Sequence, residues 1–313
     1  MIDLLPSEVE QQIIDGVAGF LAKELPLARL RPGPDGERSA DIGISAEQWH
    51  EIAGLGWFGL GIPEERGGAG FTVVAEMLVV REVGRYAVSP SISATIAAAC
   101  LAARADSELL AGLLAGERRV AFASRLCAGS DEYHLVDARG ADHLLVVDGM
   151  QAQLYGAAAF GEVRPVISLD DAVTLERARL TAGARPLLQE ADSDIGHRAS
   201  LHNSAQLLGV AEGALTLSVE YAKVREQFGQ AIGSFQTIKH RCADMAVMAE
   251  AAYAQAFFAG LSQAGGQRDA AYQIAAAKVI CAEAALANAR SGIQIHGGIG
   301  FTAECDAHVF LKR

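Results

Sequence analysis

Two stretches of this sequence combine arginine, aromatic and glycine residues in a way that suits an anionic ligand. The first is VREQFGQAIGSFQ, residues 224–236, in which Arg225 offers a planar set of donors that matches a phosphate or a carboxylate. Phe228 offers an aromatic face, and Gln236 offers a neutral hydrogen-bonding group. Local chemistry taken alone favours a simpler alternative, an interhelical loop in which Arg225 caps the preceding helix and Phe228 fills the core.

The second stretch is QIHGGIGFT, residues 294–302. Gly297 and Gly298 let a ligand approach the backbone closely, and free N–H groups in such a loop bind anions. Gln294 stands one turn before the glycines, and His296 could bond the same ligand. The alternative is a helix that ends at glycine and is capped by His296, which is a common arrangement.

The composition restricts the classes of protein to which the chain can belong. Its 313 residues are 51% hydrophobic, which is enough for a large core, and its net charge is −12. Nucleic acid binding is not expected, because phosphate contacts need clustered Lys and Arg. The five cysteines form no CxxC pair, so we interpret them as buried thiols of a reducing cytoplasm. We find no signal peptide and no uninterrupted run of about 18 apolar residues, so we expect a cytoplasmic protein without a membrane segment.

Helical patterns occupy both ends of the chain. Ser7 and Glu10 form a capping-box pattern at the start of a helix predicted over 5–30, and a second helix begins near Ser45. Apolar periodicity predicts further helices at 72–86, 89–104, 106–115, 200–222, 236–264 and 268–292. The last three are long and rich in Ala, which is typical of an antiparallel bundle.

Between the helical parts, residues 119–190 have the texture of a small sheet. Short runs rich in Val, Leu and Ile (VAFASRL, HLLVVDG, QAQLYG and VRPVISL) alternate with turn residues, and Asp148-Gly149 predicts a hairpin. The predicted fold is therefore mainly α with a small β domain. We expect an N-terminal helical domain at 1–118, a reduced β domain at 119–190 and a C-terminal helical bundle at 191–313.

A pair of small residues on the helix predicted at 200–222 bears on packing. Gly209 and Gly213 lie four apart, so they fall on one face and permit close contact with another helix. Packing within the chain is the simpler interpretation, and a subunit interface is the alternative.

Taken together, the two glycine-containing stretches resemble the acyl-CoA dehydrogenases. The pattern R-x-x-F-G-x-x-I-x-x-x-Q is followed by Q-x-x-G-G-x-G-F, as in that family. The N-terminal loop GWFGLGIPEERGGAGF, residues 56–71, resembles the family as well. AFASRLCAGSD, residues 121–131, is similar to a degenerate form of the segment at the entry to the β domain. The resemblance spans nearly the whole chain and agrees with the order helices, sheet, helices.

The resemblance implies an acyl-CoA dehydrogenase fold and the oxidation of an acyl-CoA thioester to the enoyl-CoA with FAD as cofactor. In the family a glutamate removes the α-proton and the flavin accepts the β-hydride. The ADP half of FAD reaches a neighbouring subunit, which supplies the contacts of the two stretches. Carried over to this sequence, the cofactor-binding residues are Arg225, Phe228, Gln236, Gln294, Gly297 and Gly298.

The chain departs from the family where the flavin ring would lie. Family members carry a Thr-Glu-Pro type motif before Ala-Gly-Ser-Asp, whereas residues 124–127 here read Ser-Arg-Leu-Cys. Arg125 and Leu126 thus replace groups that would lie near the flavin. The pattern Asn-Gly-x-Lys-x-Trp that holds the isoalloxazine is absent, and residues 131–195 contain no Trp.

The catalytic glutamate has no counterpart in this sequence, so we assign no catalytic residue. In most members it lies in a Tyr-Glu-Gly-Thr segment beyond the position of Arg313, and a minority place it on the first bundle helix, near Ala199 here. Asp192 and Asp194 are interpreted as loop or N-cap residues. The two acidic residues after the glycine-rich loop, Glu304 and Asp306, are expected to be solvated.

The sequence therefore keeps what a subunit offers to its neighbour's FAD and lacks what it needs for its own. It resembles the short subunit of the heterotetrameric (α2β2) acyl-CoA dehydrogenases that bacteria use on steroid side chains. The expected partners are a longer acyl-CoA dehydrogenase subunit, an acyl-CoA substrate and an electron-transfer flavoprotein, the usual acceptor in the family. The alternatives are a homo-oligomeric enzyme with an unrecognised base, such as Asp192 or Asp194, and a non-enzymatic assembly paralogue.

Overall fold

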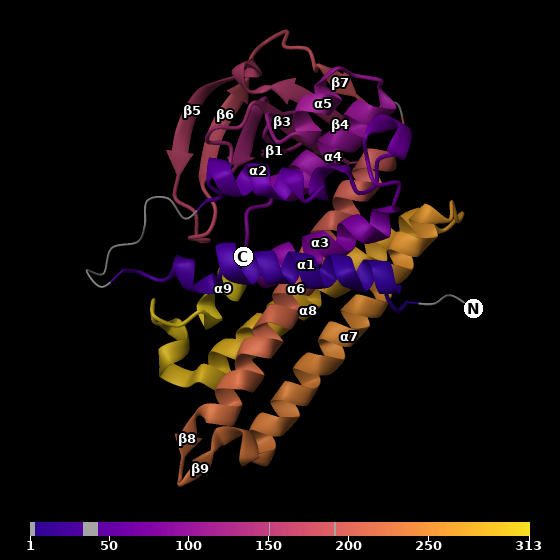
Figure 1. Ribbon diagram of the computed structural model, residues 1–313. Helices are drawn as coiled ribbons and strands as arrows, with labels where there is room; N and C mark the ends of the chain where they lie inside the picture. The colour runs from indigo at the N-terminus through magenta and orange to yellow at the C-terminus, as the bar shows by residue number, and fades with distance from the viewer. Residues whose placement is uncertain (1–3, 34–42, 150, 191) are drawn as a thin grey trace. The chain divides into compact units, whose positions relative to one another are not determined.

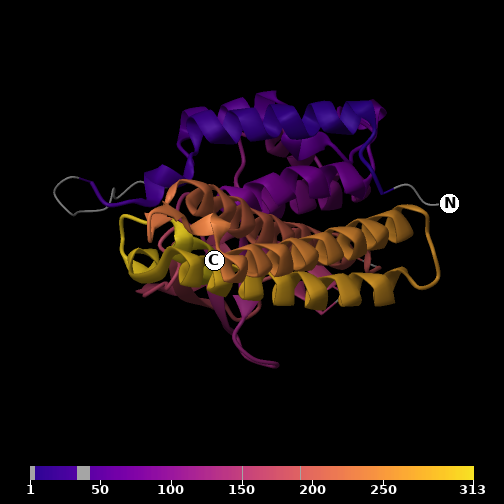
Figure 2. The same ribbon diagram turned by 90° about the horizontal axis from the view of Figure 1, so that it is seen from below.

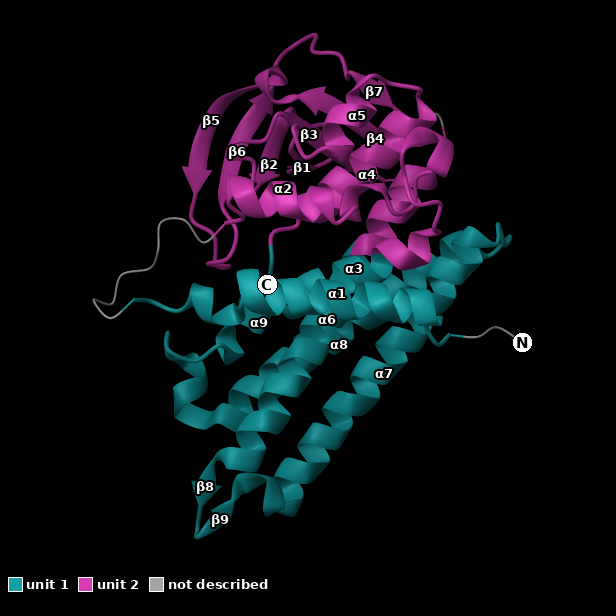
Figure 3. Ribbon diagram, in the orientation of Figure 1, with its two compact units in different colours: residues 1–42, 77–88, 203–313 teal, residues 43–76, 89–202 magenta. Residues whose placement is uncertain are grey.

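The computed structural model describes residues 4–33, 43–149, 151–190 and 192–313. These residues form two compact units, the first from 4–33, 77–88 and 203–313 and the second from 43–76, 89–149, 151–190 and 192–202 (Figure 3). The boundary falls inside two helices, α3 (Val73–Arg85) and α6 (Asp194–Val224). The fold class is confirmed as mainly α with a small sheet, while the division into three domains at 118 and 190 remains a prediction.

The first unit consists of helices, and the longest of them pack side by side. α7 spans Gln236–Ala264, as predicted, and runs alongside α8 (Ala270–His296) in both views (Figures 1 and 2). α1 (Glu8–Glu24) begins with the predicted capping box, in which Ser7 accepts from the N–H of Glu10. The shorter elements of this unit are η1 (Leu27–Leu30), η5 (Ile232–Ser234), η6 (Gly297–Phe301) and α9 (Ala307–Lys312).

Glycines let α3 and α6 touch backbone to backbone within the first unit. A Cβ added at Gly209 would lie 1.9 Å from the carbonyl oxygen of Arg81, and one at Gly84 would lie 2.2 Å from that of Gln206. A Cβ at Gly213 would lie 2.6 Å from the Phe310 ring. The two glycines of α6 are thus used for packing within the chain, which was the simpler of the two interpretations.

A buried amide joins the three long helices of this bundle. Asn288 on α8 is 1% exposed, and its Nδ2 donates to the carbonyl oxygens of Ala211 on α6 at 3.1 Å and Met245 on α7 at 2.9 Å. Both acceptors are otherwise ordinary helix carbonyls, so the amide fixes the register of α8 against its two neighbours.

The second unit packs helices on one face of its sheet. α2 (Ala46–Gly54) begins with a capping box between Ser45 and Gln48, and α4 (Ser91–Arg104) is apolar almost all round. Alanines of α4 form one core with Val120, Leu145 and Leu154 of the sheet. A helix buried on so many sides needs small side chains to fit between its neighbours. The remaining helical pieces are α5 (Leu109–Leu114), η2 (Trp57–Gly59) and η3 (Glu64–Arg66).

Seven strands form the sheet of the second unit in the order β5-β6-β2-β1-β3-β4-β7. β3 and β4 pair antiparallel with Asp148 opposite Gln151, which confirms the hairpin predicted at Asp148-Gly149. The runs predicted from sequence did not include β2, β6 and β7, because charged residues interrupt β2 and β6 and because β7 is only two residues long. The strands are β1 (Val120–Arg125), β2 (Glu132–Val136), β3 (His143–Asp148), β4 (Gln151–Gly156), β5 (Phe160–Val166), β6 (Leu175–Leu180) and β7 (Leu188–Gln189), with η4 at Ala157–Ala159.

The cysteines are free thiols, but they are not all buried. Cys100 and Cys281 are buried, which raises the pKa of both thiols and that of Cys281 to about 12. Cys242 and Cys305 are half-buried. The prediction of burial is wrong for Cys127, which is exposed after the end of β1.

Within the described residues, one segment is long and apolar enough to cross a membrane, although the sequence analysis expected none. It runs from Ala270 to Phe301, and 33% of its most apolar window is buried inside the protein. Lys278 and Glu283 interrupt the apolar run, so the segment contains no 18 consecutive apolar residues. A core helix gives the same signal, and α8 does line the bundle, yet it also exposes Tyr272, Val279 and Leu286.

Candidate functional site

A short hairpin joins α6 to α7 and carries the first sequence motif. Its strands are β8 (Glu226–Gln227) and β9 (Gln230–Ala231), and Arg225 stands immediately before it. The backbone of Arg225 is fixed by its N–H, which donates to Tyr221 at 2.9 Å, and by its carbonyl, which accepts from Ile232 at 2.7 Å. Its guanidinium makes no hydrogen bond or ion pair with the described residues. Arg225 is therefore held in place without being used as a cap for α6.

The tip of this hairpin exposes an aromatic ring on a strained backbone. Phe228 and Gly229 both have positive φ angles, 54° and 78°, as in a type I′ turn, which favours Asn, Asp and Gly. Phe228 is 93% exposed and has only an edge contact to Phe235, with ring centroids 6.1 Å apart. The idea that Phe228 fills the core is wrong. A large apolar residue in this backbone conformation is unfavourable for the chain alone, which points to a role outside it.

The second motif lies where α8 ends. Gly297 has φ 65° and ψ −142°, a conformation that favours glycine, and its N–H donates to Gln294 and Ile293. That N–H is therefore not free for a ligand, contrary to the expectation from sequence. A Cβ at Gly298 would meet nothing within 4 Å, whereas one at Gly300 would lie 2.7 Å from the carbonyl oxygen of Ile293. Gly300 is needed for packing, and Gly298 keeps a surface open.

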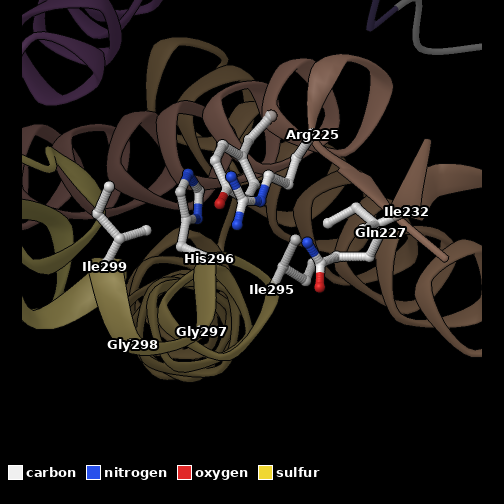
Figure 4. A pocket seen from close by; sticks show the side chains of 9 residues that line it. Arg225, Gln227, Ile232, Ile295, His296, Gly297, Gly298 and Ile299 are labelled. Atoms are coloured by element: carbon white, nitrogen blue, oxygen red, sulfur yellow. The ribbon is translucent and has the colours of Figure 1, made fainter. Parts of the chain in front are cut away.

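The two motifs meet at one cavity of about 360 Å³. Arg225 from the end of α6 and Gly297 and Gly298 from the end of α8 line it, together with Tyr221 and His296 (Figure 4). We call this space the first cavity. Arg225 is the residue of this cavity that we expect to bind an anion, because its charge has no partner within the described residues.

A second cavity of about 370 Å³ shares the same glycines. Gln294 lines it with Arg290 and Phe301, so the glycine pair separates two spaces that each contain one arginine. Four of the six predicted residues thus gather here. Gln236 is exposed at the first turn of α7, and neither it nor Phe228 lines either cavity.

Comparison with known proteins decides the family. Residues 7–114 match the acyl-CoA dehydrogenase N-terminal domain, and residues 197–313 match the acyl-CoA dehydrogenase C-terminal domain. The chain is also 35% identical to the acyl-CoA dehydrogenase IpdE2 of Mycobacterium tuberculosis, over 99% of this chain and 92% of that protein. The chain belongs to the acyl-CoA dehydrogenase family.

Other relatives and solved structures limit what can be concluded from this similarity. The acyl-CoA dehydrogenase FadE34 of Mycobacterium tuberculosis is 36% identical over 86% of this chain, which spans only 40% of its length. Butyryl-CoA dehydrogenase of Megasphaera elsdenii has the same fold, with a TM-score of 0.83 at 22% identity over 99% and 94% of the two chains. The Tcur3481–Tcur3483 steroid ACAD matches with a TM-score of 0.80 at 26% identity over 97% and 91%. Family membership indicates FAD as cofactor.

The residues of the site fit the adenosine diphosphate part of that cofactor. Arg225 supplies an unpaired planar cation, Gly298 leaves room beside the backbone, and Gln294 supplies a neutral polar group. The exposed ring of Phe228 is suited to contact with another chain or with a base. A dinucleotide needs these same elements, a cation and close backbone approach for the diphosphate and a face for the base.

Glu76 is a fully buried carboxylate near the alternative base position, and it is already paired with neighbouring side chains. Glu76 is 0% exposed, with Arg198 Nη1 at 2.5 Å, His202 Nε2 at 2.9 Å and Cys100 Sγ at 3.5 Å from its oxygens. Burial alone would raise the pKa of Glu76, but Arg198 and His202 outweigh it and hold the pKa at about 2. We call these four residues the buried charge cluster. A carboxylate with so low a pKa, shielded from solvent, is a poor general base at neutral pH.

The aspartates considered as rival bases are engaged at the start of α6. Asp192 accepts from the N–H of Asp194 at 3.2 Å, the capping role expected for it. Arg104 approaches Asp192 at 2.6 Å and Asp194 at 3.5 Å. These aspartates therefore hold a helix end and an arginine, and neither is poised as a free base.

The expectation that both acidic residues after the glycine-rich loop are solvated is half right. Glu304 is exposed, but Asp306 is 6% exposed and accepts from Arg31 Nε at 2.7 Å and Nη2 at 2.8 Å. The error arises because Arg31 lies 275 residues earlier, and no local pattern links the two.

Arg125, which departs from the family pattern at the end of β1, is held by contacts with its own sheet. Arg125 lies 5.1 Å from the Tyr133 ring, pairs with Asp148 at 3.0 Å and donates to the carbonyl of Ser130 at 2.9 Å. This arginine is thus held against its own sheet. A charged side chain with three partners leaves little reason to expect it to turn toward a ligand.

Sequence reasoning missed two residues of the site. Tyr221 lies one turn before Arg225 on α6, and the spacing of four places both on one face, a signal that was available. Arg290 precedes Gln294 by four residues on α8 in the same way. Both lie outside the glycine-containing motifs, in the helical turn that precedes each motif and lines a cavity.

Proposed function

We propose that this chain is a subunit of a heteromeric, FAD-dependent acyl-CoA dehydrogenase. In this proposal its first and second cavities hold the adenosine and diphosphate portion of an FAD whose flavin ring lies on a partner chain. The partner, a longer acyl-CoA dehydrogenase, carries the general base. The observation that carries the proposal is the Arg225 guanidinium, unpaired among the described residues, in a cavity lined by Gly297 and Gly298, where a Cβ would meet nothing within 4 Å.

The state of the carboxylates supports a base on another chain. Ala199 occupies the position on the first bundle helix where some members carry the glutamate, and alanine cannot accept a proton. The neighbouring Glu76 is buried with a pKa of about 2, and Asp192 and Asp194 pair with Arg104. Each of these observations weakens the alternative of a homo-oligomer with an unrecognised base.

An exposed apolar stripe on α8 supports assembly with a second chain of this fold. Tyr272, Val279 and Leu286 are 72%, 57% and 44% exposed, and Ala275 and Ala282 lie between them. Their spacing of alternating three and four residues is that of a helix-packing seam. Small residues at every second position allow a close approach of another helix. Such a stripe is unfavourable in water unless a partner covers it.

The substrate that we propose is a CoA ester of a steroid side chain. The support is similarity to a solved structure of a steroid ACAD, Tcur3481–Tcur3483. The chemistry that FAD supplies when bound is acceptance of the hydride from the β-carbon of the acyl group. The task left to this chain is to bind the anionic half through Arg225, and Phe228 at the exposed hairpin tip contacts the partner chain.

The test is retention of FAD by the assembled protein. We expect the chain alone to be colourless, and its co-expression with a longer acyl-CoA dehydrogenase encoded beside it to yield a yellow complex. Arg225→Ala removes a charge-assisted contact of about 1.5–3 kcal/mol, so FAD should dissociate roughly tenfold to a hundredfold more readily. The measurement is flavin absorbance per complex after gel filtration over a range of added FAD.

Arg268→Ala is the matched control. Arg268 is exposed in the turn between α7 and α8 and lines neither cavity. The Arg268→Ala variant loses one positive charge from the same unit as Arg225→Ala, and its FAD retention should stay at the level of the unaltered complex. Equal retention in the Arg225 and control variants would refute the proposed role and would favour a non-enzymatic assembly paralogue. Stoichiometric FAD on the chain alone, with acyl-CoA oxidation, would instead support the homo-oligomer.

A further inference from the structure

The exposed residues along the first half of α8 form one continuous apolar stripe. Three of them are large, Tyr272, Val279 and Leu286, and two small ones lie between, Ala275 and Ala282. We call these five residues the α8 stripe. At a rise of 1.5 Å per residue, the α8 stripe is about 21 Å long.

The order of large and small side chains in the α8 stripe is that of a seam between two helices. The large residues occupy the first position of a heptad and the alanines the fourth, so each alanine leaves room for a side chain of a facing helix. The next two positions of the series, Ala289 and Ile293, are only 1% and 6% exposed. The free part of the seam therefore ends at Leu286.

Two opposite charges border the α8 stripe. Lys278 directly precedes Val279, and Glu283 directly follows Ala282. Both charged side chains are exposed, and neither forms an ion pair with the described residues. Residues five positions apart are separated by about 140° around a helix, so one charge lies on each edge of the stripe. They are too far apart around the helix to neutralise each other.

These charges are complementary to a second copy of the same helix. When two such helices lie side by side in parallel, the residue before a first position meets the residue five positions later on the other helix. Lys278 of each copy then meets Glu283 of the other, and a two-fold axis produces this contact twice. In an antiparallel pair, by contrast, the lysine edges face each other and so do the glutamate edges.

We infer that two copies of this chain associate through the α8 stripe in parallel, with Lys278 of each copy paired with Glu283 of the other. The inference goes beyond the proposed function, because it gives the chain an interface separate from the cavities beside Arg225. A second copy is favoured over the longer subunit since both halves of the charge pattern stand on one helix. The apolar side chains supply the buried surface, and the two charges set the direction and register.

Sedimentation equilibrium of the full chain tests the pairing of charges. Lys278→Glu and Glu283→Lys should each weaken the dimer roughly tenfold, because each replaces two opposite-charge contacts by two like-charge contacts at an exposed edge. The chain with both substitutions restores the opposite charges and should return to within about threefold of the unaltered chain. Sodium chloride at about 1 M should reduce these differences by screening.

Recovery in the double variant is specific to self-association. If the α8 stripe met the longer subunit instead, the two substitutions would act on different residues of that subunit, and their effects would add. Additive losses would therefore overturn the inference. A chain that stays monomeric at every concentration tested would overturn it as well.

Val279→Arg tests the apolar part of the contact. It places two like charges inside the seam and should weaken the dimer at least about a hundredfold. Val9→Arg is the matched control, because Val9 is 51% exposed on α1, compared with 57% for Val279 on α8. The control should leave the dimer unchanged. Equal dimerisation of both variants would contradict the inference, and circular dichroism checks that both remain folded.

Disulfide cross-linking tests the direction of the helices. A parallel pair places each position of the seam beside the same position of the other copy, so Ala275→Cys and Ala282→Cys should each cross-link with themselves. An antiparallel pair places Ala275 opposite Leu286 and Ala282 opposite Val279, and neither variant should then cross-link. Mass spectrometry of the linked peptides, with the unaltered chain oxidised in parallel, identifies the bond. Dimers that fail to cross-link at both positions would overturn the parallel arrangement.

The outcome is independent of the FAD experiment. In the co-expressed complex, Lys278→Glu should leave FAD retention unchanged, whereas Arg225→Ala should lower it. If no longer subunit is captured, the proposed function fails and the α8 dimer is still expected. If Arg225→Ala lowers FAD retention while the charge variants dimerise as the unaltered chain does, only the inference fails.

Discussion

The loop end of the bundle and the buried charge cluster use charged residues in opposite ways. At the loop end, Arg225 has no hydrogen bond or ion pair with the described residues, and Phe228 is 93% exposed. In the cluster, Glu76 and Arg198 neutralise each other, and His202 adds a bond to the same carboxylate. Groups that satisfy each other hold a fold together, whereas groups left unsatisfied at a cavity are available to a ligand.

This contrast separates stability from function within one chain. Substitutions in the cluster should change the free energy of unfolding, and substitutions at the loop end should change ligand binding while leaving stability unchanged or improved. The effect of Arg225 on binding belongs to the second class. The three predictions below concern unfolding and run from the largest expected effect to the smallest.

Glu76→Ala should cause the largest loss of stability. It leaves the buried Arg198 guanidinium with only the more distant Asp194 at 3.8 Å, and removal of one partner from a buried pair costs about 3–5 kcal/mol. Urea unfolding followed by circular dichroism measures the change. Because the pKa of Glu76 is about 2, below the value of about 4.5 for an unpaired glutamate, its stabilisation is complete above pH ~4.5 and is lost as the pH falls toward 2.

Two controls accompany this variant. Glu220→Ala removes a carboxylate from an exposed pair with Lys223, and its effect should stay within about 0.5 kcal/mol. The difference between the unaltered chain and Glu76→Ala should narrow as the pH is lowered from 4.5. A loss as small as that of Glu220→Ala would show that the cluster is not held for stability.

Gly209→Ala should have the next largest effect. The added Cβ would lie 1.9 Å from the backbone carbonyl oxygen of Arg81, and a backbone atom cannot move aside as a flexible side chain can. Overpacking of this kind costs at least about 1–3 kcal/mol and outweighs the better helix propensity of alanine. The unfolding midpoint in urea should fall accordingly.

Gly16→Ala supplies the matched control for that substitution. Gly16 is inside α1, and a Cβ there would meet nothing within 4 Å. The same chemical change should therefore stabilise the chain by about 0.5–1 kcal/mol. Opposite signs for the two glycines are expected, and equal signs would contradict the close approach of α3 and α6.

Phe228→Asn should have the smallest effect, and it should be a gain. Asn-Gly is the pair that a type I′ turn favours, and Phe228 has φ 54° with little contact to its own chain. We expect thermal unfolding to show a gain of about 0.5–1 kcal/mol. Phe228→Ala lacks the turn preference and serves as the control. A lower stability in Phe228→Asn would mean that the ring serves the chain itself.

Local features of the structure could be predicted because neighbours in sequence produce them. The capping box at Ser7, the span of α7 and the hairpin after Asp148 each depend on residues a few positions apart. The glycines that end α8 belong to the same class. The strands β2 and β6 could not be recognised in this way, since their burial depends on which strands lie beside them.

By itself, the sequence determined the helices, the family and the residues that mark the ligand end, because periodicity, capping and short motifs are properties of adjacent residues. Only the tertiary structure decided which charged side chains pair with one another and which remain available to a ligand. Asp306 meets Arg31 across 275 positions, and Glu76 meets His202 across 126. Arg225 lines the first cavity with Gly297, 72 positions later in the chain, and its guanidinium has no hydrogen bond or ion pair with the described residues. The cause is that the electrostatic environment of a side chain depends on its spatial neighbours, which packing brings together.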